Sequence, residues 1–310
     1  MKRLLRNLAV ATLVVVAVWI AVGEKPAGAS GRWLRELALE PHFANVNGIK
    51  VRYVRGGQGP PVVLLHGLAS SIYSWSDVFA ELAKRHDVVA LDLPGFGGSD
   101  MPADLSFDTY PPVVLGLLDQ LGLTRASLVG NSMGGAVAAA VASEHPERVQ
   151  RLVLIDSAGL NLAPKDRPAL LRFIGALPVA LLEHVPVRRA LTRIAMRQVF
   201  FDPRLVTEER FEEYVAPVLR PGAVASISSL LRGPRSDSAE FLALLRRIRA
   251  PTLVLWGRED RWVPVAQADR FAAAIPGSRL TILAGCGHLP QEERPREVAA
   301  LLVSFFASPP

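Results

Sequence analysis

The sequence predicts an α/β protein built on a mostly parallel, doubly wound sheet with helices on both faces. Short apolar runs rich in β-branched residues alternate along the chain with helical patterns. Most of these runs are continuously apolar, as in strands that are covered on both faces. One long stretch lacks any strand signal, which predicts a helical insertion between two strands.

Composition supports a folded globular chain and excludes several classes of protein. Of the 310 residues, 50% are hydrophobic and 21% are charged, so the chain has enough apolar residues to bury a core. The single cysteine, Cys286, excludes an intrachain disulfide and a multi-cysteine zinc site. The net charge is +6, but the arginines are scattered. We therefore expect no nucleic-acid binding.

Residues 1–29 have the composition of a targeting segment. A short basic start precedes an apolar run over residues 8–22, and Ala27-Gly28-Ala29 supplies the small residues of a cleavage site. This predicts a signal peptide that is removed after Ala29, leaving a periplasmic or secreted protein. The alternative is an uncleaved anchor that associates with the membrane through residues 4–23. Both alternatives predict export across the cytoplasmic membrane.

The expected elements follow in order after this segment. A strand over 51–55 follows the turn signal Asn47-Gly48 and belongs to a hairpin. Further strands are expected at 62–65, 88–91, 127–129, 152–155, 253–255 and 280–283. Helices are expected near 74–85, 109–121, 133–145, 237–249, 265–275 and 294–307. Residues 30–158 and 236–310 are thus predicted to form the two parts of one core.

The insertion, residues 159–235, is predicted to be a helical cap. Helical runs near 168–182, 186–199 and 207–219 are punctuated by prolines. An insertion of this size is a subdomain rather than a loop. It forms either a lid over the carboxyl edge of the sheet, where open α/β sheets place their sites, or a helical decoration.

A candidate nucleophile lies in Gly130-Asn131-Ser132-Met133-Gly134. This G-x-S-x-G pattern follows an expected strand and opens an alanine-rich helix. A sharp strand–turn–helix junction projects the serine hydroxyl, and the flanking glycines avoid collisions across the turn. The helix N-terminus favours negative charge that develops beside it. Ser132 is therefore the predicted nucleophile.

Several motifs together resemble the α/β-hydrolase superfamily with a helical cap, over about residues 43–307. They are His66-Gly67, Pro94-Gly95-Phe96-Gly97-Gly98-Ser99, the Ser132 turn, Leu255-Trp256-Gly257 with Asp260, and Gly287-His288. The resemblance implies the α/β-hydrolase fold. The residues around Ser132 are similar to two branches of it. One branch is the bacterial family V lipases and carboxylesterases, and the other cleaves carbon–carbon bonds in ring-fission products.

A serine needs a base to take its proton, and that base needs an acid to orient it. His288 follows the last expected strand and is the predicted base. Asp260 follows the preceding strand and is the predicted acid, in the chain order Ser, Asp, His that α/β-hydrolases use. Asp156, at the end of an earlier strand, is the backup acid.

Two backbone N–H groups are expected to bind the developing oxyanion. One belongs to Met133, directly after the nucleophile, and the other to Leu68, in the loop after His66-Gly67. The resemblance implies a glycine-rich sequence at this loop in the carbon–carbon hydrolases. Here the loop reads Leu68-Ala69-Ser70-Ser71, which favours an ester hydrolase.

The predicted function is that of an exported carboxylesterase or lipase that works through an acyl-enzyme on small-molecule or lipid-like esters. A carbon–carbon bond hydrolase, a cofactor-free perhydrolase and a non-catalytic scaffold or binding protein are the alternatives. Ser132 stands where dehalogenases and epoxide hydrolases of the superfamily carry Asp, which argues against those activities. The chemistry requires no cofactor and no metal.

Apolar residues of the cap are either walls of an acyl pocket or packing between cap and core. They are Phe173, Leu177, Leu181, Phe200 and Phe201. No feature of the sequence specifies an oligomeric state.

Overall fold

A computed structural model of the protein describes residues 31–161, 168–232 and 238–308. Residues 1–29, for which the sequence predicts a signal peptide or an anchor, lie outside the described part. Within the described part no single helix is long and apolar enough to span a membrane. Two cap helices pass that test only as a pair bent by 84°.

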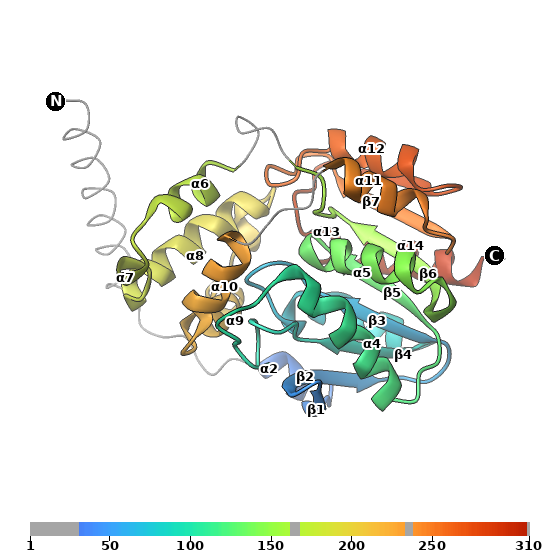
Figure 1. Ribbon diagram of the computed structural model, residues 1–310, viewed down its shortest axis with the longest axis horizontal. Coiled ribbons are helices and arrows are strands. Elements are labelled where there is room, and N and C mark those ends of the chain that lie inside the picture. The colour runs from blue at the N-terminus through green and yellow to red at the C-terminus, as the bar shows by residue number, and fades with distance from the viewer. Residues whose placement is uncertain (1–30, 162–167, 233–237, 309–310) are drawn as a thin grey trace.

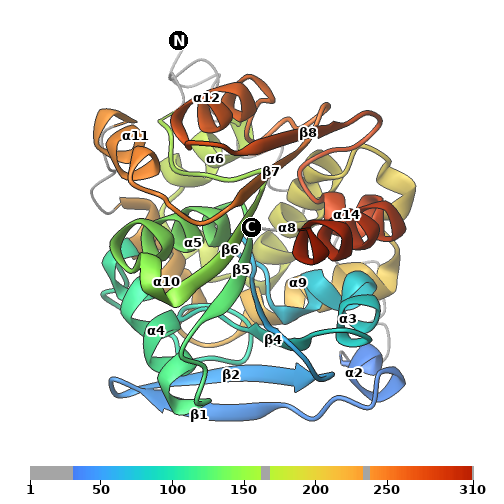
Figure 2. The same cartoon turned by 90° about the vertical axis from the view of Figure 1, so that its right-hand side faces the viewer.

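An eight-stranded sheet forms the centre of the molecule, in the order β1-β2-β4-β3-β5-β6-β7-β8 (Figures 1 and 2). Strands β1 and β2, and β2 and β4, are antiparallel, and all the other neighbours are parallel. The strands are β1 (His42–Val46), β2 (Ile49–Gly56), β3 (Pro61–Leu65), β4 (Asp87–Leu91), β5 (Ala126–Asn131), β6 (Val149–Ile155), β7 (Thr252–Gly257) and β8 (Arg279–Leu283). The predicted fold class, a mostly parallel α/β-hydrolase sheet, is confirmed.

The hairpin β1–β2 turns at Asn47 and Gly48, which have φ values of 53° and 84°. A two-residue turn with both φ angles positive matches the twist of the flanking strands. The sequence predicted only the second strand of this hairpin. Strand β1 lies at the edge of the sheet and is mostly exposed, so it lacks the continuous apolar run that marks the buried strands.

Helices cover both faces of the sheet (Figure 2). One face carries α4 (Tyr110–Gln120), α5 (Met133–Glu144), α11 (Ser238–Arg246) and α12 (Ala266–Ala274). The other carries α2 (Arg32–Glu36), α3 (Ser76–Ala83) and α14 (Pro295–Ala307). Short elements connect these, namely α13 (Pro290–Glu293) and the 3-10 helices η1 (Ile72–Trp75), η2 (Phe107–Thr109) and η3 (Pro146–Arg148).

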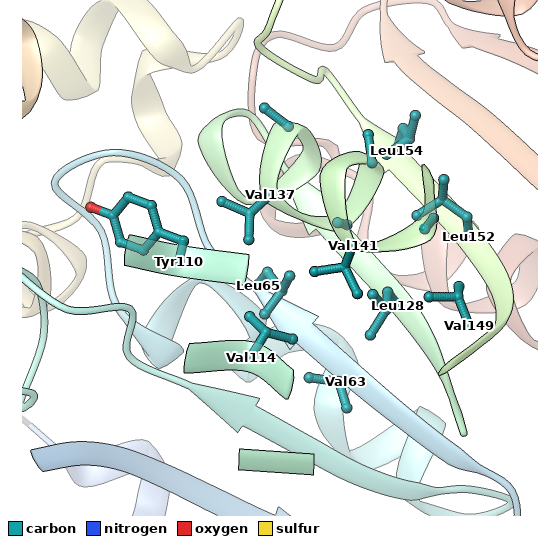
Figure 3. Close-up of a cluster of buried hydrophobic side chains, with 14 of the residues drawn as sticks. Val63, Leu65, Tyr110, Val114, Leu128, Val137, Val141, Val149, Leu152 and Leu154 are labelled. Atoms are coloured by element: carbon teal, nitrogen blue, oxygen red, sulfur yellow. The ribbon is translucent and has the colours of Figure 1, made fainter. Parts of the chain in front are cut away.

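The core beneath α5 consists of aliphatic side chains from three central strands and two helices. Figure 3 shows Val63, Leu65, Leu128, Leu152 and Leu154 of the sheet facing Val137, Val141 and Val114 of the helices. Each fully buried side chain of this size contributes about 1.5–3 kcal/mol to folding. Because α5 is packed on nearly all sides, its first turn, which follows Ser132, has little freedom to move.

The cap lies between β6 and β7 and extends from one end of the core (Figure 1). Its described elements are α6 (Ala169–Ala176), α7 (Val179–Leu182), α8 (Val185–Val199), η4 (Pro203–Leu205), α9 (Glu208–Leu219) and α10 (Ala223–Arg232). The expected helix 168–182 is two helices, because Pro178 is extended and begins α7. Helix α10 was not predicted.

Several polar contacts link the cap to the core, and two of them come from side chains of α9. Arg210 of α9 donates to Asp77 of α3 at 2.7 Å, and the hydroxyl of Tyr214 donates to Glu292 of α13. Burial raises the pKa of Glu292 to about 8, although the Arg210 guanidinium opposes that shift. Because Glu292 belongs to the helix just after His288, the cap is tied directly to the base of the predicted site.

The buried side chain of Asp92, which follows β4, links three segments of the core. Its buried carboxylate accepts from the side chain of Arg52, from Ile72 N at 2.7 Å and from Gly98 N at 2.7 Å. One side chain therefore joins β2, η1 and the glycine-rich turn after β4.

We predict that Asp92→Ala lowers the free energy of unfolding by about 3 kcal/mol, because it leaves the Arg52 charge and two buried N–H groups without their acceptor. Urea denaturation followed by circular dichroism measures this. The exposed Asp104 is the control, since Asp104→Ala is expected to change stability by less than about 0.5 kcal/mol. Equal stability of the two variants would contradict this role of Asp92.

Candidate active site

Ser132 occupies a strained turn between β5 and α5. Its φ and ψ are 53° and −117°, a conformation that residues other than glycine rarely adopt. A Cβ on Gly130 would lie 2.2 Å from the carbonyl oxygen of Gly134, and one on Gly134 would lie 2.1 Å from that of Leu65. The turn is therefore possible only with glycines at both positions. It holds Ser132 at the first turn of a buried helix, as the motif predicts.

His288 and Asp260 form a buried pair at the same edge of the sheet. Nδ1 of His288 lies 2.7 Å from Oδ2 of Asp260. Oδ1 of Asp260 accepts from the N–H groups of Trp262 at 2.7 Å and Val263 at 3.0 Å. Because Oδ1 is held by these two amides, Oδ2 faces the imidazole in one orientation. An ionised carboxylate in this position orients an imidazole and stabilises its cation.

Contacts to the backbone bring the His288 loop against the Ser132 turn. The side-chain amide of Asn131, which precedes the serine, donates to the carbonyl oxygens of His288 at 3.1 Å and Ile155 at 3.2 Å. From the cap side, His288 N donates to the carbonyl oxygen of Val199 at 2.8 Å. Within the described chain the Ser132 hydroxyl makes no hydrogen bond. In enzymes without bound substrate, the hydrogen bond between a catalytic side chain and its base is often long and tightens only when substrate binds.

Two unused amides lie close to Ser132. Neither Met133 N nor Leu68 N donates a hydrogen bond to any described residue. Gly67 brings the second amide close, since a Cβ there would lie 3.1 Å from Cβ of Ser132. Free N–H groups beside a nucleophile, one of them at a helix N-terminus, suit an anion that forms during the reaction.

Asp156 lies beside the pair but does not bond the histidine. It is fully buried, and its Oδ1 accepts from Gly257 N at 3.0 Å. Burial, and next the neighbouring Asp260 carboxylate, raise the pKa of Asp156 well above its ordinary value. Asp156, Asp260 and His288 offer ligand atoms within 4.8 Å of one another, as a metal site would. The Asp260 oxygens already accept three N–H groups, one of them from the His288 ring, as the acid of a triad does.

Other histidine and cysteine side chains near the site have structural contacts. His66 is buried, accepts Leu93 N at 3.0 Å on Nε2, and contacts the Gly67 carbonyl oxygen at 2.7 Å through Nδ1. Burial lowers the pKa of His66, so the ring is neutral and braces the loop that carries Leu68. Burial raises the pKa of the Cys286 thiol, which disfavours a reactive thiolate.

The five apolar cap residues do not form a single wall. Phe173, Leu177 and Leu181 pack in a cluster internal to the cap. Phe200 is fully buried in a second cluster, with Tyr214 of α9, Leu289 and Trp262. Phe201 is 42% exposed. Phe200 packs against residues adjoining the His288–Asp260 pair, and the backbone of Phe201 lies close to Gly287, the residue before His288.

Sequence reasoning missed two residues at the site. The Trp262 ring stacks on His288 with centroids 6.2 Å apart and planes 28° apart. Asn131 joins the serine turn to the histidine loop. Asn131 lies inside the G-x-S-x-G motif, so its position was a usable signal. Nothing in the local sequence places the Trp262 ring on His288, because the contact depends on how the loops after β7 and β8 fold.

Comparison with known proteins gives one consistent fold. A family model described as the alpha/beta hydrolase fold matches residues 60–295. The 2-hydroxymuconate semialdehyde hydrolase of Pseudomonas sp. (strain CF600) is 35% identical over 269 residues, covering 84% of this chain and 91% of the relative.

Two solved structures are also similar. One is a membrane phospholipase A described as a novel bacterial virulence factor, with a TM-score of 0.76 and 30% identity over 99% of this chain and 98% of that chain. The other is a meta-cleavage product hydrolase from Pseudomonas fluorescens IP01, with a TM-score of 0.72 and 29% identity over 86% of this chain and 97% of that chain.

We predict that Gly130→Ala displaces Ser132, because the added methyl group would collide with the backbone of α5. The variant is expected to lose about 3 kcal/mol of stability or more, as overpacked cores do. Gly122→Ala is the control, because a Cβ there meets nothing within 4 Å. It is expected to lose only about 1–2 kcal/mol for its left-handed backbone. Thermal unfolding that ranked the two variants in the opposite order would contradict the steric argument.

Proposed function

The chain belongs to the α/β-hydrolase family, and from that premise we propose that it is a serine hydrolase acting on a substrate carbonyl. The observation that carries this proposal is the buried contact of 2.7 Å between His288 and Asp260, next to a serine on a strained turn. Ser132 is the proposed nucleophile, His288 the base and Asp260 the acid. The N–H groups of Met133 and Leu68 are the proposed oxyanion hole. Asp156 is not needed as a substitute acid in this arrangement.

In the first half-reaction the Ser132 oxygen attacks the carbonyl carbon and its proton passes to Nε2 of His288. The negative charge of the tetrahedral intermediate develops on the carbonyl oxygen, facing the two free amides. The bond to the leaving group then breaks, and His288 returns the proton to that group. Asp260 stabilises the imidazolium while it exists.

In the second half-reaction water attacks the acyl carbon, and His288 takes the proton of the water and gives it to Ser132. The products are a carboxylic acid and the protonated leaving group. The leaving group is an alcohol if the substrate is an ester, and a carbon acid if a carbon–carbon bond is cleaved. The same machinery serves both substrates.

The comparisons favour a carbon–carbon bond hydrolase over the general ester hydrolase expected from the sequence. Both a sequence relative and a similar structure carry names of ring-fission product hydrolases, at 35% and 29% identity. This substrate class is therefore our first candidate. The loop Leu68-Ala69-Ser70-Ser71 lacks the glycine-rich sequence that the resemblance implies for that branch.

A lipid ester is the second candidate, and a separate observation favours it. The likeness to the membrane phospholipase A extends over 99% of this chain, whereas the likeness to the ring-fission hydrolase covers 86%. A resemblance that reaches nearly the whole chain, and a non-glycine oxyanion loop, both agree with hydrolysis of lipid-like esters. A family V lipase or carboxylesterase is the corresponding branch.

We predict that the purified full-length chain hydrolyses one of these classes and that Ser132→Ala loses about 10³-fold or more of kcat/KM. The substrates to compare are a 2-hydroxy-6-oxo-dienoate, p-nitrophenyl esters of increasing chain length, and a phospholipid in detergent micelles. Ser304→Ala, an exposed serine on α14, is the control and is expected to keep full activity.

Turnover of the dienoate alone supports the first candidate, and turnover of the phospholipid and long-chain esters supports the second. A well-folded enzyme that turns over none of them, or a Ser132→Ala variant as active as the wild type, would contradict the serine mechanism.

We further propose that residues 1–29 direct the chain across the cytoplasmic membrane, where it is released or stays anchored. The apolar run over 8–22 and the small residues before Ser30 support this.

Placing a charge in the apolar run, as in Val15→Arg, is expected to keep the protein in the cytoplasm. Cell fractionation followed by mass spectrometry of the N-terminus measures both export and cleavage. Recovery of the unaltered chain in the cytosolic fraction would contradict the proposal.

A further inference from the structure

Asp156 is a buried carboxyl group with no part in the mechanism given above. It follows β6, and its own N–H donates to the carbonyl oxygen of Leu255 in β7 at 3.0 Å. Its Oδ1 accepts from Gly257 N, also in β7. Its φ is 44°, in the left-handed region that favours glycine or asparagine. The carboxyl group of Asp156 therefore lies at the end of β7, and the loop that follows β7 carries Asp260.

The second oxygen of Asp156 has no donor. Oδ2 is buried and accepts no hydrogen bond from any described residue. The Asp260 carboxylate and the His288 ring are close to this carboxyl group, since one ligand atom from each of the three residues lies within 4.8 Å of the others. Two facing carboxylates without a donor between them repel, and burial strengthens that repulsion. A proton on one of them turns the repulsion into a hydrogen bond.

The contacts decide which carboxyl group holds that proton. Asp260 already accepts three N–H groups, from Trp262, Val263 and the His288 ring. Asp156 accepts one, from Gly257. The proton therefore belongs on Asp156.

The other titratable groups near Asp156 point the same way. Glu293, from α13, accepts the N–H groups of Phe201 at 2.7 Å and Gly287 at 2.8 Å, and its negative charge disfavours a second one on Asp156. Cys286, from the loop after β8, is a buried thiol. No cation among the described residues pairs with Asp156.

We propose that Asp156 is a positioning residue, whose protonated carboxyl group donates a hydrogen bond from Oδ2 to the carboxylate of Asp260. Asp260 alone then holds the negative charge that faces His288. Its two oxygens accept four donors, three N–H groups and one O–H, and the carboxylate is fixed against rotation. A neutral Asp156 also leaves one negative charge, rather than two, to set the basicity of His288.

This inference rests on the proposed function, since it concerns the acid of the same triad. It is best tested with a fluorophosphonate probe, which labels an activated serine whatever its natural substrate. Asp156→Asn has the shape and donor of a protonated aspartic acid, because its amide oxygen can accept Gly257 N while its NH₂ donates to Asp260. Asp156→Ala has neither group.

We expect Asp156→Ala to label about 10-fold more slowly or worse, because the acid is no longer held in place. Asp156→Asn is expected to restore labelling to within about 3-fold of wild type, with an unchanged pH midpoint of the labelling rate. Thermal unfolding checks that both variants fold.

Three results would overturn the inference. If Asp156 is ionised in the active enzyme, Asp156→Asn removes a negative charge near His288 and shifts the midpoint to lower pH by about half a unit or more. Equal slowing in the Asn and Ala variants would show that the carboxyl group itself is required. Wild-type labelling in both would show that Asp156 has no positioning role.

A second measurement does not depend on the serine. Difference infrared spectroscopy of wild type against Asp156→Asn, at about pH 7, is expected to show one carbonyl band of a protonated carboxyl group that the variant lacks, while the band of Glu292 is common to both and cancels. Absence of that band would overturn the inference even if labelling behaves as expected. Failure of the wild type to label at all, with the band present, would instead count against the proposed function.

Discussion

The parallel pairing of β5, β6 and β7 is the constraint on which the site depends. The register places Asn131 beside Ile155, and Ile155 beside Leu255. All three strands therefore end at one edge, and the residues that follow them must share that edge. Ser132, Asp156 and Asp260 are those residues, and the loop after β8 adds His288. Parallel strands with covered faces bring such groups together without any local contact between them in the sequence.

The cap takes part in this arrangement through its backbone as well as its side chains. The carbonyl oxygen of Val199, at the end of α8, accepts the N–H of His288. A Cβ on Gly287 would lie 2.5 Å from the same oxygen, so the histidine loop and the cap fit only with glycine there. Tyr214 reaches Glu292 four residues after the histidine. The His288 loop is thus held between core and cap, and a movement of α8 or α9 would displace His288.

The two neighbouring carboxyl groups of the site, Asp156 and Asp260, have different surroundings. Asp260 accepts three N–H groups, whereas Asp156 accepts one, and burial raises the pKa of Asp156. The amides of Met133 and Leu68 are without acceptors in the described chain, and in the proposed mechanism they receive the charge of the tetrahedral intermediate. None of these features depends on the leaving group. Under the proposed mechanism, carbon–carbon and ester substrates would therefore differ only in what binds beyond Ser132, His288 and Asp260.

The sequence by itself determined the fold class, the hairpin turn, most of the buried strands and the strand–turn–helix junction at Ser132. Each of these has a local cause: a continuous apolar run, an Asn-Gly turn, or glycines where a Cβ would meet backbone. Tertiary structure alone decided the rest. The exposed edge strand β1 and the helix α10 lack a strong local pattern. The stacking of Trp262 on His288, the separation of the five cap residues and the closeness of Asp156 to Asp260 arise between segments far apart in the chain. Such contacts depend on register and packing between elements, which no local pattern encodes.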